Sequence, residues 1–138
     1  MKLPQEPITS TIILMPWPKK PPLNLNRRAH WSEIATVRQT AAWMAKTKKL
    51  PQGLPHVWVE LIYRAPDRRR RDEDNLVATL KPVCDGLVDH GLVQDDHTGL
   101  MTKFMPTILP PDSPEYPTIP TGATAMVVTW ETHTTPQE

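Results

Sequence analysis

Four runs of apolar and β-branched residues along the chain have the length and composition of β-strands. They cover residues 8–15, 56–65, 100–109 and 124–131. The first run ends at Pro16-Trp17-Pro18, where the prolines stop a strand. The second run is the most apolar, which is typical of a strand with neighbours on both sides. We therefore predict four strands, with residues 56–65 at the centre of a sheet.

Two other segments carry apolar residues at helical spacing. In residues 33–46 the spaced apolar positions are Ile34, Val37, Ala41, Met44 and Ala45. Ser32 stands just before this segment as the expected N-cap, with Trp31 as a hydrophobic staple. In residues 75–90 a second apolar stripe ends at Gly91, a residue type that commonly follows a helix.

Pro82 lies inside the second predicted helix and leaves two possibilities open. Either the helix kinks at this proline, or an irregular turn precedes a shorter helix with Pro82 in its first turn. In both cases the order of elements is β-α-β-α-β-β. This order predicts a single α+β domain over residues 1–138, with a mixed sheet and two packed helices.

Proline dominates the segment between the last two predicted strands. Five prolines fall between residues 110 and 120, and the segment has little that could pack, so we expect a mobile, Pro-rich loop over residues 106–120. We also expect a flexible tail over residues 132–138.

The formal net charge of +1 hides a strong polarity along the chain. Up to residue 71 there are 14 Lys and Arg against 4 Asp and Glu, whereas after it there are 2 against 11. This division is compatible with a basic surface for a polyanion beside an acidic pocket for a cation. It is equally compatible with charges of both signs spread over a solvated surface.

Composition also limits the class of protein. No run of residues is long and apolar enough for a membrane span, and no secretory signal is visible, so we expect a soluble intracellular protein. Cys84 is the only cysteine, which excludes an internal disulfide, and its apolar neighbours suggest a buried position. The five tryptophans are expected in the core, although Trp17 and Trp31 flank a basic loop and remain candidates for nucleic-acid contact.

The strongest chemical signal is the acidic pair Asp72 and Asp74, which follows directly after four arginines. In an extended chain, residues two apart project from the same face, so these carboxylates can converge while Glu73 points away. Their mutual repulsion is relieved by a cation, and oxygen ligands at this spacing suit Mg²⁺ or Mn²⁺. The alternative is a solvated acidic turn in which Asp74 caps a helix that starts at Asn75.

Three neighbouring features favour the metal site. The arginines at 68–71 would place phosphate-binding charge beside the carboxylates. A second acidic pair, Asp95-Asp96, follows the helix and could return to the first pair. Lys81 is the only cation between residues 72 and 102, where it could contact a scissile phosphate.

The segment RRRRDEDNLVATLKPVCDGLVDHGLVQDD, residues 68–96, resembles the core of the RusA family of Holliday junction resolvases. The family pattern is a basic run, Asp-x-Asp-Asn-Leu, a Lys, Asp-(Ala/Gly)-Leu and Asp-Asp. The opening LMPWPKKPPLNLNRRAHW also resembles the first strand and Asn-containing loop of that family. This chain departs from the family pattern in one place. Between Asn75 and Lys81 it has about one helical turn more than the best-known member of the family.

The resemblance implies roles for particular residues. Asp72, Asp74 and Asp96 would bind Mg²⁺, for which Mn²⁺ would substitute, with Asp95 as an adjacent acid that could replace Asp96. Lys81 matches the lysine important for cleavage. Asp85 matches a family aspartate to which we assign no catalytic role. Phosphate contacts are expected from the following basic residues: Arg68, Arg69, Arg70, Arg71, Arg27, Arg28, Lys19 and Lys20.

Taken together, these features predict a metal-dependent endonuclease that resolves branched DNA by paired nicks and leaves 5′ phosphates. The family is dimeric, and a homodimer suits the two symmetry-related strands of a four-way junction. The resemblance also implies the cytoplasm of a bacterium or a phage-infected cell. The competing hypothesis is a non-catalytic protein that binds branched DNA on the same scaffold. An EF-hand is excluded because its sixth and twelfth loop positions would be Val77 and Val83.

Overall fold

A mixed sheet of five strands forms the centre of the computed structural model, which describes residues 3–132. The strands are β1 (Ile8–Leu14), β2 (Val57–Arg64), β3 (Met101–Lys103), β4 (Thr107–Leu109) and β5 (Thr124–Glu131). The helices are α1 (Trp31–Thr47), the 3₁₀ turn η1 (Glu73–Leu76) and α2 (Val77–His90). The α+β class, with a mixed sheet and two helices, is confirmed. Residues 133–138 of the predicted tail lie outside the described residues.

β2 is the central strand, as predicted. It pairs antiparallel with β5, which in turn pairs antiparallel with β1, and on its other side it pairs parallel with both β3 and β4. The prediction of one strand over residues 100–109 is wrong, because the chain leaves the sheet between Lys103 and Thr107. Pro106 lies in this gap, and proline cannot donate a hydrogen bond to the neighbouring strand.

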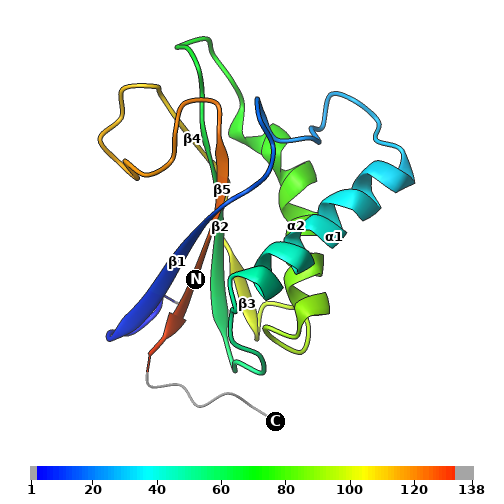
Figure 1. The fold of residues 1–138 in the computed structure, drawn as a ribbon, viewed down its shortest axis with the longest axis vertical. Helices are drawn as coiled ribbons and strands as arrows, with labels where there is room; N and C mark the ends of the chain where they lie inside the picture. The colour runs from blue at the N-terminus through cyan, green and yellow to red at the C-terminus, as the bar shows by residue number, and fades with distance from the viewer. Residues whose placement is uncertain (1–2, 133–138) are drawn as a thin grey trace.

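Both long helices cover the same face of the sheet (Figure 1). They approach closely at Gly86 of α2, where an added Cβ would lie 2.2 Å from the backbone oxygen of Arg38 on α1. An ion pair between Arg38 and Asp89, with N and O 2.6 Å apart, crosses the same contact. Glycine at position 86 therefore allows the close approach of the two helices.

The start of α1 differs from the prediction. His30, not Ser32, is the N-cap: its Nδ1 accepts a hydrogen bond from the Ser32 backbone N–H at 3.1 Å. The Glu33 carboxylate reciprocates by accepting from the His30 backbone N–H. An imidazole nitrogen thus replaces the hydroxyl of the usual capping residue, which is why the sequence pattern suggested the wrong position.

α2 runs through Pro82 and ends at Gly91, whose φ of 93° lies in the left-handed region. The helix begins at Val77, so Pro82 lies in its second turn and not its first. Neither possibility holds in full: a 3₁₀ turn does precede a shorter helix, but Pro82 lies inside that helix and not in its first turn. Pro82 is buried together with the apolar residues of α2 that face the sheet.

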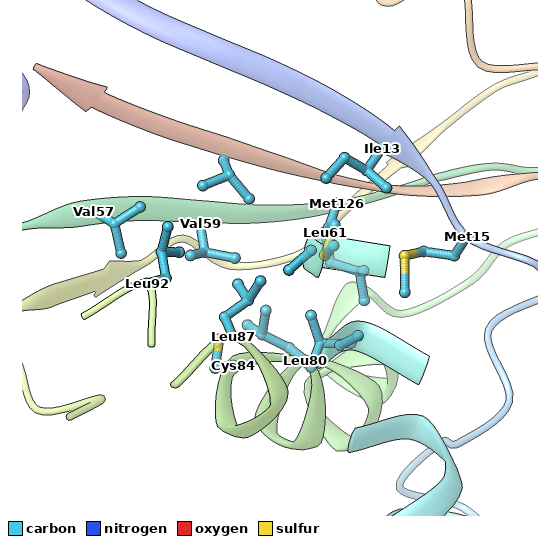
Figure 2. Packing of buried hydrophobic residues seen from close by; sticks show 14 of the residues in the cluster. Ile13, Met15, Val57, Val59, Leu61, Leu80, Cys84, Leu87, Leu92 and Met126 are labelled. Atoms are coloured by element: carbon cyan, nitrogen blue, oxygen red, sulfur yellow. The ribbon is translucent and has the colours of Figure 1, made fainter. Parts of the chain in front are cut away.

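The main core lies between the sheet and α2 (Figure 2). Alternate β2 side chains, Val57, Val59 and Leu61, pack toward Cys84 and Leu87 of α2. Cys84 is buried as predicted, and desolvation raises the pKa of its thiol to about 12, so the thiol stays protonated at neutral pH.

The tryptophans do not all lie in the core. Trp58 is buried, and Trp17 and Trp130 pack against the main core. Trp31 and Trp43 are 72% and 64% exposed, so their predicted core positions are wrong. On α1 the buried stripe is Val37, Ala41 and Ala45, and at about 100° per residue Trp43 points away from it.

The Pro-rich segment after β4 is packed, contrary to the expectation that it had little to pack. Ile119 is buried in a second, smaller cluster together with Ile62 and Leu109. Arg64, at the end of β2, donates five hydrogen bonds to backbone carbonyls of this segment. The segment is therefore organised around a buried guanidinium. Within residues 3–132, no helix has the length and apolar character needed to cross a membrane.

Candidate functional site

The acidic pair Asp72 and Asp74 lies in the connection between β2 and α2, and both residues are exposed. Asp72 has extended backbone angles, with φ −96° and ψ 123°, but Asp74 is already inside η1. The assumption of an extended chain through both residues is therefore wrong, because the chain coils immediately after Asp72. The proposed capping role of Asp74 is not seen either: the N-cap of α2 is Leu76.

Glu73, between the two aspartates, contacts a different part of the molecule. Its carboxylate accepts a hydrogen bond from the backbone N–H of Ile108 in β4 at 3.2 Å. This bond fixes η1 to the edge of the sheet. Asp72 and Asp74 are thereby held at the end of the sheet where the connections 15–30, 65–72 and 110–123 also lie (Figure 1).

Three of the four arginines in the run 68–71 are paired with carboxylates. Asp67 forms ion pairs with Arg71 at 2.9 Å and with Arg69 at 3.1 Å. Hydrogen bonds from Arg71 and then Arg69 hold the pKa of the Asp67 carboxyl well below its usual range. Arg68 is paired with Asp112 of the Pro-rich segment. Within residues 3–132, Arg70 has no ion pair.

A basic hollow of about 470 Å³ gathers cations from two distant parts of the chain. Lys19 and Lys20 line it from the connection after β1, and the segment Arg69–Arg71 lines it from the connection after β2. Tyr63 joins the two sides by donating a hydrogen bond from its hydroxyl to the Lys19 carbonyl at 3.0 Å. These five cations lie on one surface and are not spread over the molecule. Asp72 lines the same hollow.

Lys81 and Asp96, both predicted site residues, are in direct contact. The Lys81 Nζ lies 2.8 Å from Asp96 Oδ2 and 3.0 Å from Asp85 Oδ1. Lys103 of β3 contacts the same Asp96 oxygen at 2.9 Å. Hydrogen bonds to Asp96 and Asp85 raise the pKa of Lys81, and those from Lys81 and Lys103 lower the pKa of Asp96. Lys81 and Asp96 therefore both stay charged around neutral pH.

Lys103 is a member of this cluster that the sequence analysis missed. It follows Asp96 by seven residues, and no motif marks it. A signal was nevertheless present, since Lys103 is the only charged residue in the predicted strand 100–109. Asp85, to which no catalytic role was assigned, is also part of the cluster.

The structure keeps the two predicted acidic pairs apart. Within the described residues 3–132, no group of three or more His, Cys, Asp or Glu is placed to hold a metal ion. Asp96 is instead held by Lys81 of α2. The expected meeting of the two acidic pairs at one metal site is therefore not seen. Asp95 is exposed, and its Oδ1 accepts a hydrogen bond from the Asp96 backbone N–H.

The donor chemistry of the first pair alone suits magnesium. Mg²⁺ commonly uses one or two carboxylates and completes its octahedron with water and phosphate oxygens. Both Asp72 and Asp74 are exposed, and Asp72 lines the basic hollow. Asp96 does not fit as a third ligand in this arrangement, because two lysines already satisfy one of its oxygens.

The remaining predicted DNA contacts lie before α1. Arg27 forms an ion pair with Glu33 at 2.7 Å, which raises the Arg27 pKa. Arg28 is exposed and has no ion pair within residues 3–132. Four of the predicted DNA contacts therefore form no ion pair with a described carboxylate: Lys19, Lys20, Arg28 and Arg70.

No protein-family model matches the chain. A protein of Xylella fastidiosa (strain Temecula1 / ATCC 700964), named only as an uncharacterized protein, is 30% identical over 110 residues. The match covers 63% of this chain and 70% of the relative. The chain therefore belongs to the same family as this Xylella protein.

Proposed function

We propose that this chain is a Mg²⁺-dependent endonuclease that cuts branched DNA, of the type found in RusA-like resolvases. The observation that carries the proposal is the basic hollow, in which Asp72 shares one surface with Lys19, Lys20 and the segment Arg69–Arg71. A carboxylate among five cations has no obvious structural purpose there. It suits a surface that must bind a phosphate backbone and also place a divalent cation beside it.

In this proposal Asp72 and Asp74 would hold Mg²⁺ or Mn²⁺, and a third carboxylate, from Asp95 or Asp96, would have to move toward them when the ion binds. The ion would supply an activated water and would stabilise charge on the leaving oxygen of the phosphodiester. Lys81 contacts the phosphate from the adjoining cluster. Recruitment of Asp96 would require it to exchange its lysine contacts, so Asp95, which has an exposed carboxylate, is the simpler third ligand.

The unpaired cations should dominate DNA binding. Arg70→Ala is expected to weaken binding to a four-way junction several-fold and to reduce the slope of log K against log salt by about 1, because one phosphate contact is lost. Arg69→Ala should have a smaller effect, since Asp67 already offsets part of its charge. Titrations at several salt concentrations measure both values. If neither variant changed the slope of log K against log salt, the arginine run would not belong to the DNA interface.

A four-way junction presents two strands in symmetry-related positions, which suits a homodimer with one site in each subunit. The expected reaction is a pair of nicks that leaves 5′ phosphates. The alternative is a protein that binds branched DNA without cutting it. The lysine contacts of Asp96 favour that alternative, because they satisfy one of the predicted ligands internally.

A cleavage panel separates these functions. The protein is incubated with Mg²⁺ and with a four-way junction, a flap, a fork and a linear duplex of matched sequence. The expected result is symmetrical nicking of the junction that stops when EDTA is added. Tight binding to the junction without nicking, at any Mg²⁺ or Mn²⁺ concentration, would establish the non-catalytic alternative. If the protein cut only the linear duplex, the proposed specificity for branched DNA would be wrong.

A further inference from the structure

A second hollow, of about 360 Å³, lies between α2 and the connection that precedes α1. Its walls are mainly apolar and include Leu25, Ile34 and Pro82, whereas Arg27 and Lys81 supply cationic groups. Leu25 is 60% exposed and Ile34 is 42% exposed. Exposed Trp31 lies one helical turn before Ile34 and extends the same apolar surface. Large apolar side chains gathered at one exposed place commonly mark a binding surface.

This apolar hollow adjoins the basic hollow. Leu23 and Asn24 line both, so the two hollows are neighbours, and together we call them the depression, with an apolar side and a basic side. Thr79 of α2 fixes the boundary: its hydroxyl donates to the Leu23 carbonyl at 2.7 Å and accepts from the Leu23 N–H at 3.1 Å. Both Thr79 and Leu23 are buried. The depression is therefore anchored to the helix and does not depend on a loosely held loop.

We propose that the apolar hollow takes a single unpaired nucleobase of the DNA substrate, while the basic hollow holds the phosphates beside it. The inference rests on the proposed function and adds to it a reason for preferring branched DNA. A branch point supplies bases that are unstacked from their neighbours, whereas a linear duplex must be opened first.

The chemistry of the depression matches one nucleotide unit. A base has flat apolar faces, which suit the exposed side chains of Leu25 and Ile34. Its polar edge suits the Asn24 amide, and Asn24 Oδ1 is already oriented by a hydrogen bond from the Asn26 N–H at 2.9 Å. The attached phosphates suit Lys19 and Lys20 at the other end.

The test compares two DNAs that differ by one base. A duplex with a single bulged thymidine and the same duplex with an abasic residue at the bulge are bound in EDTA. The wild-type chain is expected to prefer the thymidine bulge by about tenfold, a typical gain for one stacked base. Leu25→Ser with Ile34→Ser should abolish this preference and leave binding to the abasic DNA unchanged. Trp43→Ser, which removes an exposed apolar side chain from the other end of α1, is the matched control and should keep the preference.

Equal binding of the two DNAs by the wild-type chain would overturn the inference, as would an unchanged preference in the double variant. Because the measurement is made without metal, it is independent of cleavage. A thymidine preference together with no nicking in Mg²⁺ would therefore support the base site and count against the endonuclease. Nicking without a thymidine preference would support the endonuclease and overturn the base site.

Discussion

Replacing Asp72 with Asn is expected to slow junction cleavage by about 10²-fold or more and to leave junction binding intact or stronger. Asparagine has nearly the same shape but no charge, so it loses most of its attraction for Mg²⁺. It also removes the negative charge from a hollow lined by five cations, which favours phosphate binding. Single-turnover cleavage and gel-shift titration of one four-way junction measure the two effects. Asp74→Asn should slow cleavage to a similar extent.

Glu115→Gln is the matched control for these variants. Glu115 is an exposed carboxylate in the Pro-rich segment, and only its backbone contacts Arg64. The control should cleave the junction at the wild-type rate. Wild-type rates for both Asp72→Asn and Asp74→Asn would overturn the metal-site assignment. In the same assay, whichever of Asp95→Asn and Asp96→Asn has the larger defect identifies the third carboxylate.

The periodicity of apolar residues predicted the main elements well because each depends on local sequence. β2 was recognisable as central from its apolar character, and the end of α2 from Gly91. The errors have local causes as well. Pro106 divides the third predicted strand in two, and an imidazole replaces the expected hydroxyl as the cap of α1. Neither feature alters apolar periodicity, so the pattern could not reveal it.

The arrangement of the site depends on contacts between distant residues, and these the sequence predicted only in part. The motif identified Asp72 and the arginines, and the structure places Lys19 and Lys20 beside the arginines as one basic surface. The expected meeting of the two acidic pairs depended on how far the chain returns after α2. Lys81 and Lys103 hold Asp96 in ion pairs instead. Periodicity carries no information about such contacts.

Arg64 is the clearest example of a long-range interaction that the sequence concealed. It is 4% exposed, and its five N–H groups all donate to carbonyls, those of Pro110, Ser113, Glu115, Tyr116 and Ile119. The guanidinium has five N–H donors in a fixed plane, so every donor is satisfied. The same segment carries Asp112, the partner of Arg68. Arg64 therefore positions one of the carboxylates that neutralise the arginine run.

Arg64→Met is accordingly expected to lower the free energy of unfolding by about 3 kcal/mol, because it leaves several carbonyls without their charged donor. Arg64→Lys should recover only part of this loss, since an ammonium has three donors and cannot reach five carbonyls in one plane. Urea denaturation followed by circular dichroism measures both values. Arg38→Met removes an arginine from an exposed ion pair and should cost no more than about 1 kcal/mol. If Arg64→Met were as mild as Arg38→Met, the Pro-rich segment would not depend on the guanidinium, and Arg68 would keep its partner Asp112 without it.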